Sequence, residues 1–179
     1  NREDNYPANT GATLITALEQ LSAWVSQWLN GDYTNDIRAY EMNLSVIRAG
    51  DGGALYRALS IQQRALNQAN TLFDNPATVQ QRICPRGQSS TQAEILQNVV
   101  SKFWIQDLQR RSAALSRRYF ALMPALQALE QQLAEGEPSI YFHWRQQRDA
   151  QLKQFLAAPK AHSLRINKIY HQCDLAVGA

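Results

Sequence analysis

The sequence predicts an all-α fold: a single-domain bundle of six to eight helices stapled by one disulfide. Apolar residues recur three and four positions apart along most of the chain, which is the period of one helix face. Alternating apolar and polar stretches are short and interrupted, so we expect no strand. Cys84 and Cys173 lie far apart without a CxxC motif, and this pattern favours a disulfide over a metal or redox site.

The first three helices are expected between clear turn signals. The first covers residues 13–29 and ends at Asn30-Gly31, where glycine supplies the left-handed residue past a helix terminus. A second helix, over about residues 36–48, ends at the glycine-rich segment 49–53. The third follows over about residues 54–73.

A short helix and a loop occupy the middle of the chain. Asn75-Pro76 indicates an N-cap followed by proline at the first helical position, which starts a short helix through Ile83. Residues 84–90 are expected to form a loop. Thr91 and Glu94 then make a capping box that opens the longest helical run.

Two prolines are expected to interrupt the helices of the C-terminal half. Proline removes a backbone hydrogen bond and clashes with the preceding turn, so Pro124 should kink or divide the long run, and Ala158-Pro159 should close a later helix. After a turn at residues 136–138, the remaining helices are expected over residues 140–156 and 163–175.

The domain organisation predicted from the sequence is simple. Residues 13–179 should form one α-helical domain, because no linker and no repeat of fixed period divides them. The polar residues 1–12, with Pro7 and Gly11, are interpreted as a flexible leader. The chain starts at Asn1 without methionine, which fits a processed export product, with a lipid tether upstream of Asn1 as one form of it.

A disulfide between Cys84 and Cys173 would close a loop of roughly 90 residues, worth on the order of 4–5 kcal/mol in the chain-entropy model. Such bonds persist in oxidising compartments. The predicted location is therefore periplasmic or otherwise extracytoplasmic. The alternative is a pair of unrelated buried thiols.

Motifs for catalysis, cofactors and metals are missing from the sequence. There is no GxSxG motif, no phosphate-binding glycine loop and no metal-ligand spacing, and the three histidines are dispersed. Carboxylates such as Glu130 and Asp149 are interpreted as solvated helix faces. No catalytic residue, cofactor or metal is therefore proposed, and the sequence favours a protein that is not an enzyme. The net charge of +3 is too small to predict nucleic-acid binding, and no stretch approaches a transmembrane helix.

Two sets of residues are candidates for binding a partner. One is a pair of arginine doublets seven positions apart, expected on one helix face that could bind an acidic partner: Arg110, Arg111, Arg117 and Arg118. The other is a set of aromatic positions: Trp24, His143 and Trp144. The alternatives are a solvated arginine face and tryptophan packed in the core.

These observations lead to one functional hypothesis with two alternatives. The first is a non-enzymatic envelope protein that acts through protein–protein interaction as an accessory, adaptor or inhibitor. The alternatives are a ligand-sensing periplasmic domain of a membrane receptor, and an enzyme with an arginine-lined pocket inside the bundle. The sequence leaves the oligomeric state open.

Overall fold

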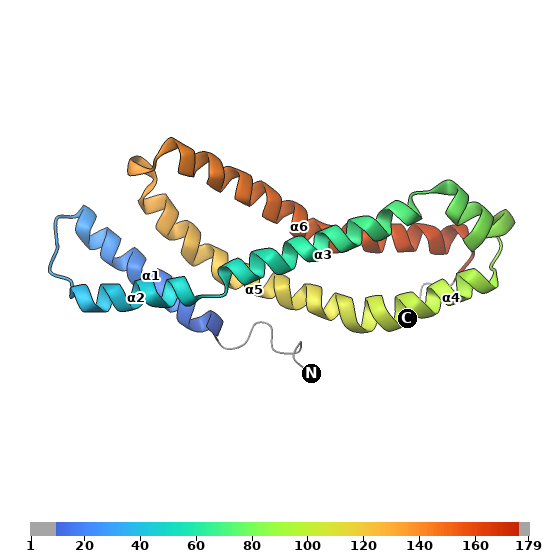
Figure 1. Ribbon diagram of the computed structural model, residues 1–179, viewed down its shortest axis with the longest axis horizontal. Helices are drawn as coiled ribbons and strands as arrows, with labels where there is room; N and C mark the ends of the chain where they lie inside the picture. The colour runs from blue at the N-terminus through green and yellow to red at the C-terminus, as the bar shows by residue number, and fades with distance from the viewer. Residues whose placement is uncertain (1–9, 176–179) are drawn as a thin grey trace. The chain divides into compact units, whose positions relative to one another are not determined.

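The computed structural model describes residues 10–175, and within that range it contains helices and connecting turns but no strand (Figure 1). This confirms the all-α prediction. The α-helices are α1 Thr10–Leu29, α2 Ile37–Ala49, α3 Gly52–Phe73, α4 Thr91–Val99, α5 Gln109–Gln132 and α6 Ser139–Gln172. Two π-helical segments, η1 Thr78–Ile83 and η3 Val100–Leu108, and two 3₁₀ turns, η2 Pro85–Gly87 and η4 Ala134–Gly136, complete the described elements.

The predicted number of helices is wrong. The described residues form five helices rather than six to eight, because α4, η3 and α5 follow one another as a single helical run. Pro124 lies inside α5 and Pro159 lies inside α6, so neither proline ends a helix. The predicted helices at residues 140–156 and 163–175 are consequently both parts of α6.

Burial on both sides of each proline explains why the helices continue. Leu122 and Ala125 flank Pro124, and Phe155 and His162 flank Pro159; all four side chains are buried. Proline inside a helix costs about 3 kcal/mol. Burial of a large apolar side chain gains about 1.5–3 kcal/mol. Ending the helix at the proline would turn several such side chains out of the core.

The predicted ends of individual helices are correct to within a few residues, with two corrections. α1 begins at Thr10, so the last residues of the predicted 1–12 leader belong to a helix, while residues 1–9 lie outside the described part of the chain. The N-cap of α4 is Ser90 rather than Thr91, because the Ser90 hydroxyl accepts the hydrogen bond from the Ala93 N–H at 3.2 Å. The predicted capping box with Glu94 is therefore wrong.

The chain divides into two compact units. Unit 1 contains residues 1–57 and 114–149, and unit 2 contains residues 58–113 and 150–179. The helices α3, α5 and α6 each include residues of both units. One domain over residues 13–179 stays a prediction.

Unit 1 has its core between α1 and parts of α3 and α5. Leu14 and Leu18 of α1 are buried, as are Leu55 of α3 and Leu122 of α5. α2 packs beside α1, where the Asn43 side chain donates to the Ala17 carbonyl at 3.1 Å (Figure 1). None of the residues of α2 is fully buried, so α2 covers the core rather than forming it.

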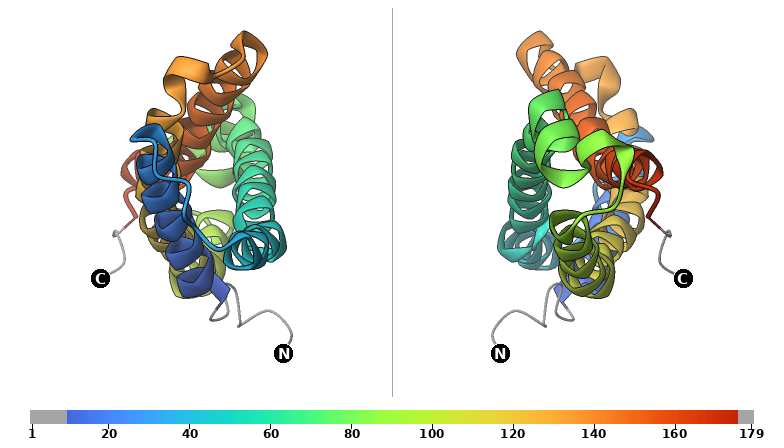
Figure 2. Two further views of the ribbon diagram at one scale, coloured as in Figure 1. Left: turned by 90° about the vertical axis from the view of Figure 1, so that its left-hand side faces the viewer. Right: turned by 90° about the vertical axis from the view of Figure 1, so that its right-hand side faces the viewer.

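Unit 2 has two adjoining apolar clusters. The first brings together α3, α4–η3 and α6 through Leu66, Val100, Trp104, Ala158, Ile166 and Tyr170. The second surrounds the disulfide and contains Val79, Cys84, Ala93, Ile169 and Cys173. The right-hand view of Figure 2 looks onto this end of unit 2, where the η1–α4 connection lies beside the C-terminal end of α6.

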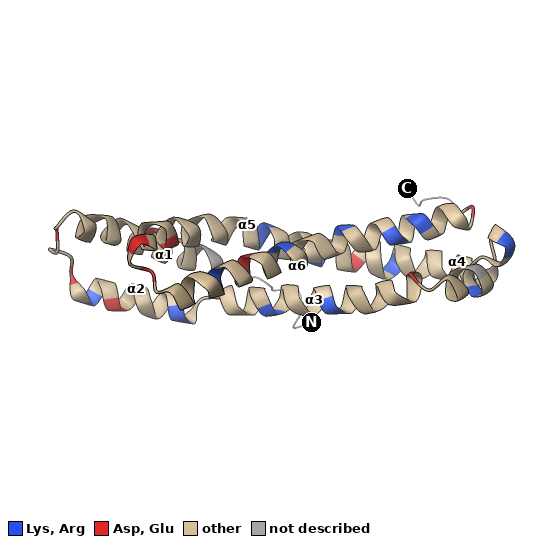
Figure 3. Cartoon of the chain, turned by 90° about the horizontal axis from the view of Figure 1, so that it is seen from above, with Lys and Arg blue, Asp and Glu red and all other residues tan. Residues whose placement is uncertain are grey.

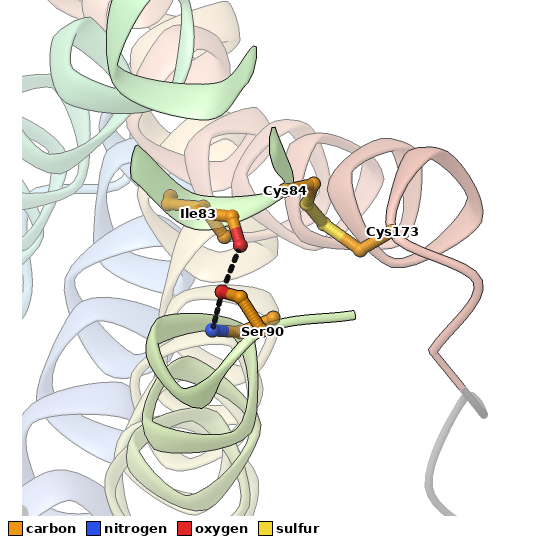
Figure 4. Close-up of a disulfide and its surroundings, with 5 residues drawn as sticks. Ile83, Cys84, Ser90 and Cys173 are labelled. Carbon is orange, nitrogen blue, oxygen red and sulfur yellow. Dashed lines mark hydrogen bonds between the residues drawn. A yellow bond between two sulfur atoms is a disulfide. The ribbon is translucent and has the colours of Figure 1, made fainter. Parts of the chain in front are cut away.

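The predicted Cys84–Cys173 disulfide is present, with the two Cα atoms 5.2 Å apart (Figure 4). Both cysteines are buried. The neighbouring Ser90 hydroxyl donates to the Ile83 carbonyl at 2.5 Å and also caps α4. The bond and the cap together fix the loop between η1 and α4 against the end of α6.

Among the described helices, none is both long enough and apolar enough to cross a membrane.

Candidate functional site

Arg118 does not belong to the exposed arginine face that the sequence predicts. Its side chain is only 5% exposed, and its guanidinium donates to both carboxylate oxygens of Asp51 at 2.8 and 2.5 Å. The hydrogen bond from Arg118 lowers the pKa of Asp51. Arg118 therefore acts as a structural ion-pair partner within unit 1, linking α5 to the start of α3.

The other three arginines of that set remain on the surface. In unit 2, Arg110 donates from Nε to the Gln106 carbonyl at 2.5 Å, and Arg111 pairs with Asp107 at 3.0 Å. Arg117, in unit 1, is also exposed. An exposed pair such as Arg111–Asp107 contributes little to stability. Arg110, Arg111 and Arg117 therefore remain candidates for contact with an acidic partner, whereas Arg118 does not.

Trp24 is buried in unit 1, where its ring lies 6.3 Å from the ring of Tyr40. Trp28 contacts the same tyrosine edge-on at 5.5 Å and is partly exposed. The alternative interpretation, in which Trp24 packs in the core, is therefore the one that fits its position. A buried indole is not presented to a partner in this conformation.

His143 and Trp144 lie in the first turns of α6, in a segment whose side chains are all exposed. We call residues 140–144 the aromatic segment. Ile140 is 79% exposed, Trp144 51%, and Tyr141 and Phe142 40% each. The rings of Tyr141 and Trp144 are stacked with centroids 5.4 Å apart, so together with Ile140 they form one apolar surface. Large aromatic side chains grouped on a surface mark interaction sites.

A buried ion pair supports the aromatic segment from beneath. The Arg148 guanidinium donates to both oxygens of Glu130 at 2.5 and 2.9 Å, and the Tyr141 hydroxyl donates to Glu130 at 3.1 Å. Arg148 also pairs with Asp149 at 2.8 Å, and its guanidinium lies 5.3 Å from the centroid of the Trp144 ring. One residue thus connects the carboxylates to the exposed indole through a cation–π contact.

Glu130 is buried, so the interpretation of this carboxylate as part of a solvated face is wrong. Burial disfavours the charged form of Arg148, but its hydrogen bonds to Glu130 and Asp149 more than offset this and raise the pKa of Arg148. Burial, and then the charge of Glu130, raises the pKa of Tyr141. Arg148 and Tyr141 therefore both stay protonated near neutral pH and can donate to Glu130.

A second ion pair holds the other side of the segment. Arg145 donates to both oxygens of Glu137 at 3.1 and 2.7 Å, and its guanidinium lies 5.7 Å from the Phe142 ring centroid. Glu137 precedes α6 in the turn after η4. Two exposed rings of the aromatic segment, Phe142 and Trp144, are therefore each backed by an arginine that is itself held by a carboxylate.

The sequence does contain a signal for these buried charges. Arg148 precedes the buried Leu152 and Phe155 by four and seven positions, so it lies on their helix face. Arg118 precedes the buried Leu122 by four positions in the same way. A charged residue in register with a buried apolar face indicates a paired charge.

The ligand chemistry available near the segment is limited. Within the described residues, no group of three or more histidine, cysteine, aspartate or glutamate side chains is placed to hold a metal ion. The carboxylates Glu130 and Glu137 are committed to arginines. What the segment offers is an apolar, aromatic surface on a fixed support.

Comparison with known proteins gives a family. The model of the DUF3080 family, described as "Protein of unknown function", matches residues 2–177. The chain belongs to the DUF3080 family. No curated protein and no solved structure matches the chain. The family description names no activity, so we infer a function from the residues of this chain.

Proposed function

We propose that this DUF3080 protein is a non-enzymatic, extracytoplasmic protein that binds another protein as an accessory, adaptor or inhibitor. The aromatic segment, residues 140–144, is its binding surface. The observation that carries the proposal is the combination of exposure and supporting contacts: Tyr141 and Trp144 are stacked and half-exposed, above the Glu130–Arg148 pair.

The physical reason is that ordering a binding surface costs free energy, and less is lost when the surface is ordered in advance. Tryptophan and tyrosine supply large contact areas with few rotatable bonds, and they dominate the energetics of protein interfaces. Here the arginines beneath the rings, Arg145 and Arg148, already restrict them.

The disulfide supports the proposed extracytoplasmic location. Cys84–Cys173 links two buried cysteines, and structural disulfides persist in oxidising compartments. An acidic region of the partner could additionally contact Arg117, which lies in the same unit as the aromatic segment.

The arginine-lined pocket of the enzyme alternative receives no such support. The buried arginines Arg118 and Arg148 are each committed to a carboxylate.

The test is a comparison of two double variants in capture from extracts of the producing cells. Phe142→Ala with Trp144→Ala removes two rings from the surface, and Tyr33→Ala with Met42→Ala removes two large, even more exposed side chains elsewhere in unit 1. We expect the affinity of the first variant for the captured partner to fall by roughly 30-fold or more, as for interface hot spots. The second variant should retain the partner. Equal capture by both variants would refute the proposal, provided that the circular dichroism of both is unchanged.

A further inference from the structure

The two units carry opposite net charge. Unit 2 contains ten lysine and arginine residues and four aspartate and glutamate residues, which gives +6, whereas unit 1 contains eight and eleven, which gives −3. The modest charge of the whole chain, +3, conceals this difference. Charge asymmetry of this kind indicates an anionic partner for the basic part.

Part of this charge lies along α6. Residues 150–172 contain no aspartate or glutamate, and their basic residues are visible along α6 in Figure 3. One face, which we call the lysine stripe, has spacings of seven, four, four and three; its members, all exposed, are Lys153, Lys160, Leu164, Lys168 and His171.

The opposite face of the same helix is buried in unit 2. Its members include Phe155, Ala158, His162, Ile166 and Ile169. The orientation of α6 is therefore fixed by its core contacts, and the stripe is held facing away from the core.

Stabilisation of the helix dipole does not account for the stripe. Cations near a helix C-terminus are favourable, but the effect falls off within the last turn. Lys168 and His171 lie near the end of α6 at Gln172, whereas Lys153 and Lys160 lie more than three turns before it. Within the described part of unit 2, the ion pairs recorded involve Arg111 and Arg165 and none of the three lysines.

We propose that the lysine stripe docks the protein on an anionic lipid bilayer surface. The stripe spans about 27 Å of one helix face at 1.5 Å per residue, so its three ammonium groups can approach one plane together. Lysine acts as a compact point charge without the bidentate geometry of arginine, which suits a field of headgroups better than a specific acidic protein surface. Anionic lipids attract each such residue by about 1 kcal/mol, equivalent to about fivefold in partitioning.

Leu164 adds an apolar contact in the middle of the stripe, because its side chain is 59% exposed. Beside it an open hollow of about 570 Å³ is lined by Leu164, Asn167, Lys168, His171 and Gln172. A headgroup phosphate that enters this hollow can accept hydrogen bonds from the side-chain amides of Asn167 and Gln172 and pair with the ammonium group of Lys168. No tryptophan, tyrosine or phenylalanine belongs to the stripe, which disfavours single-stranded nucleic acid as the partner.

The experiment measures partitioning of the oxidised full chain onto phosphatidylglycerol–phosphatidylcholine vesicles and onto phosphatidylcholine vesicles. We expect binding to the anionic vesicles only, weakening as salt is raised. The variant Lys153→Gln, Lys160→Gln, Lys168→Gln should bind roughly 100-fold more weakly, at about fivefold per lysine. The corresponding triple arginine variant keeps the charge and should bind as the native protein does.

A matched control removes three positive charges from other exposed positions of unit 2: Arg64→Gln, Arg82→Gln and Lys102→Gln. The affinity of this control for the anionic vesicles should fall by less than tenfold. Equal losses in the stripe variant and the control would overturn the proposal, since net charge alone would then explain binding. Equal binding to phosphatidylcholine vesicles would also overturn it. The proposal would also be overturned if the protein bound polyglutamate through the lysine stripe and did not bind vesicles, since the partner would then be an acidic protein.

Discussion

Replacing Glu130 with glutamine removes the carboxylate that compensates Arg148 inside unit 1, while the side-chain volume hardly changes. Glu130 accepts two hydrogen bonds from the guanidinium and one from Tyr141. In the variant, Arg148 keeps only Asp149 as a charged partner, and the Asp149 side chain is 33% exposed. Removal of one member of a buried ion pair costs about 3–5 kcal/mol. Because Asp149 still compensates part of the charge, we expect the free energy of unfolding to fall by about 3 kcal/mol, the lower end of this range.

Urea unfolding measures this loss directly. The midpoint should fall while the m-value stays constant, since the surface exposed on unfolding is unchanged. At about 2–4 °C per kcal/mol for a chain of this size, the thermal midpoint should fall by about 6–12 °C. Asp107→Asn is the control, because it disrupts the exposed pair with Arg111 and should change stability by less than about 0.5 kcal/mol. A loss below about 1 kcal/mol for Glu130→Gln would refute the assignment of this pair as a buried support.

Two further predictions concern unit 2. Arg86 has φ +61°, a left-handed conformation that favours glycine, so Arg86→Gly should raise the unfolding free energy by about 0.5–1 kcal/mol. Gly87 has φ +71°, so Gly87→Ala should lower the unfolding free energy. If urea unfolding gives the opposite order, backbone strain at these positions does not determine stability. The His162 ring is buried and 2.7 Å from the Asn70 side-chain oxygen, and burial, then the charge of Arg165, lowers the pKa of His162 below 6.5. The unfolded chain then binds the proton more readily, so the stability contribution is complete above pH 6.5 and is lost as the pH falls from there through the folded-state pKa. This slope should vanish in His162→Gln, and its persistence there would assign it to another group.

The helices could be predicted because their signals are local. Apolar spacing and the turn at Asn30-Gly31 are properties of adjacent residues, and they predicted the first three helices to within a few residues. Pro124 and Pro159 were misleading for the opposite reason. Their local preference for ending a helix is outweighed by the burial of side chains on both sides, which depends on the tertiary structure.

The candidate site could be predicted only in part. The exposed aromatic cluster at His143 and Trp144 is visible in the sequence as an unusual local composition. The partners in the ion pairs beneath and beside it are not, because Arg148 finds Glu130 across 18 positions and Arg145 finds Glu137 across 8. In the same way, Arg118 finds Asp51 across 67 positions. The spacing of the arginine doublets placed Arg118 on an exposed face, although its register with the buried Leu122 indicates a paired charge. The identity of that partner depends on the tertiary structure.

Photo-crosslinking in living cells from a photoreactive amino acid at position 143 tests directly whether the aromatic segment binds a partner. His143 is exposed and belongs to neither ion pair that supports the segment, so its replacement should leave that support intact. We expect a discrete crosslinked protein from position 143, lost when Trp144→Ala is added, and no such product from position 33, where Tyr33 is also exposed. The same product from both positions, or none from position 143 in cells that contain the folded, oxidised protein, would contradict the claim that this segment is the binding surface.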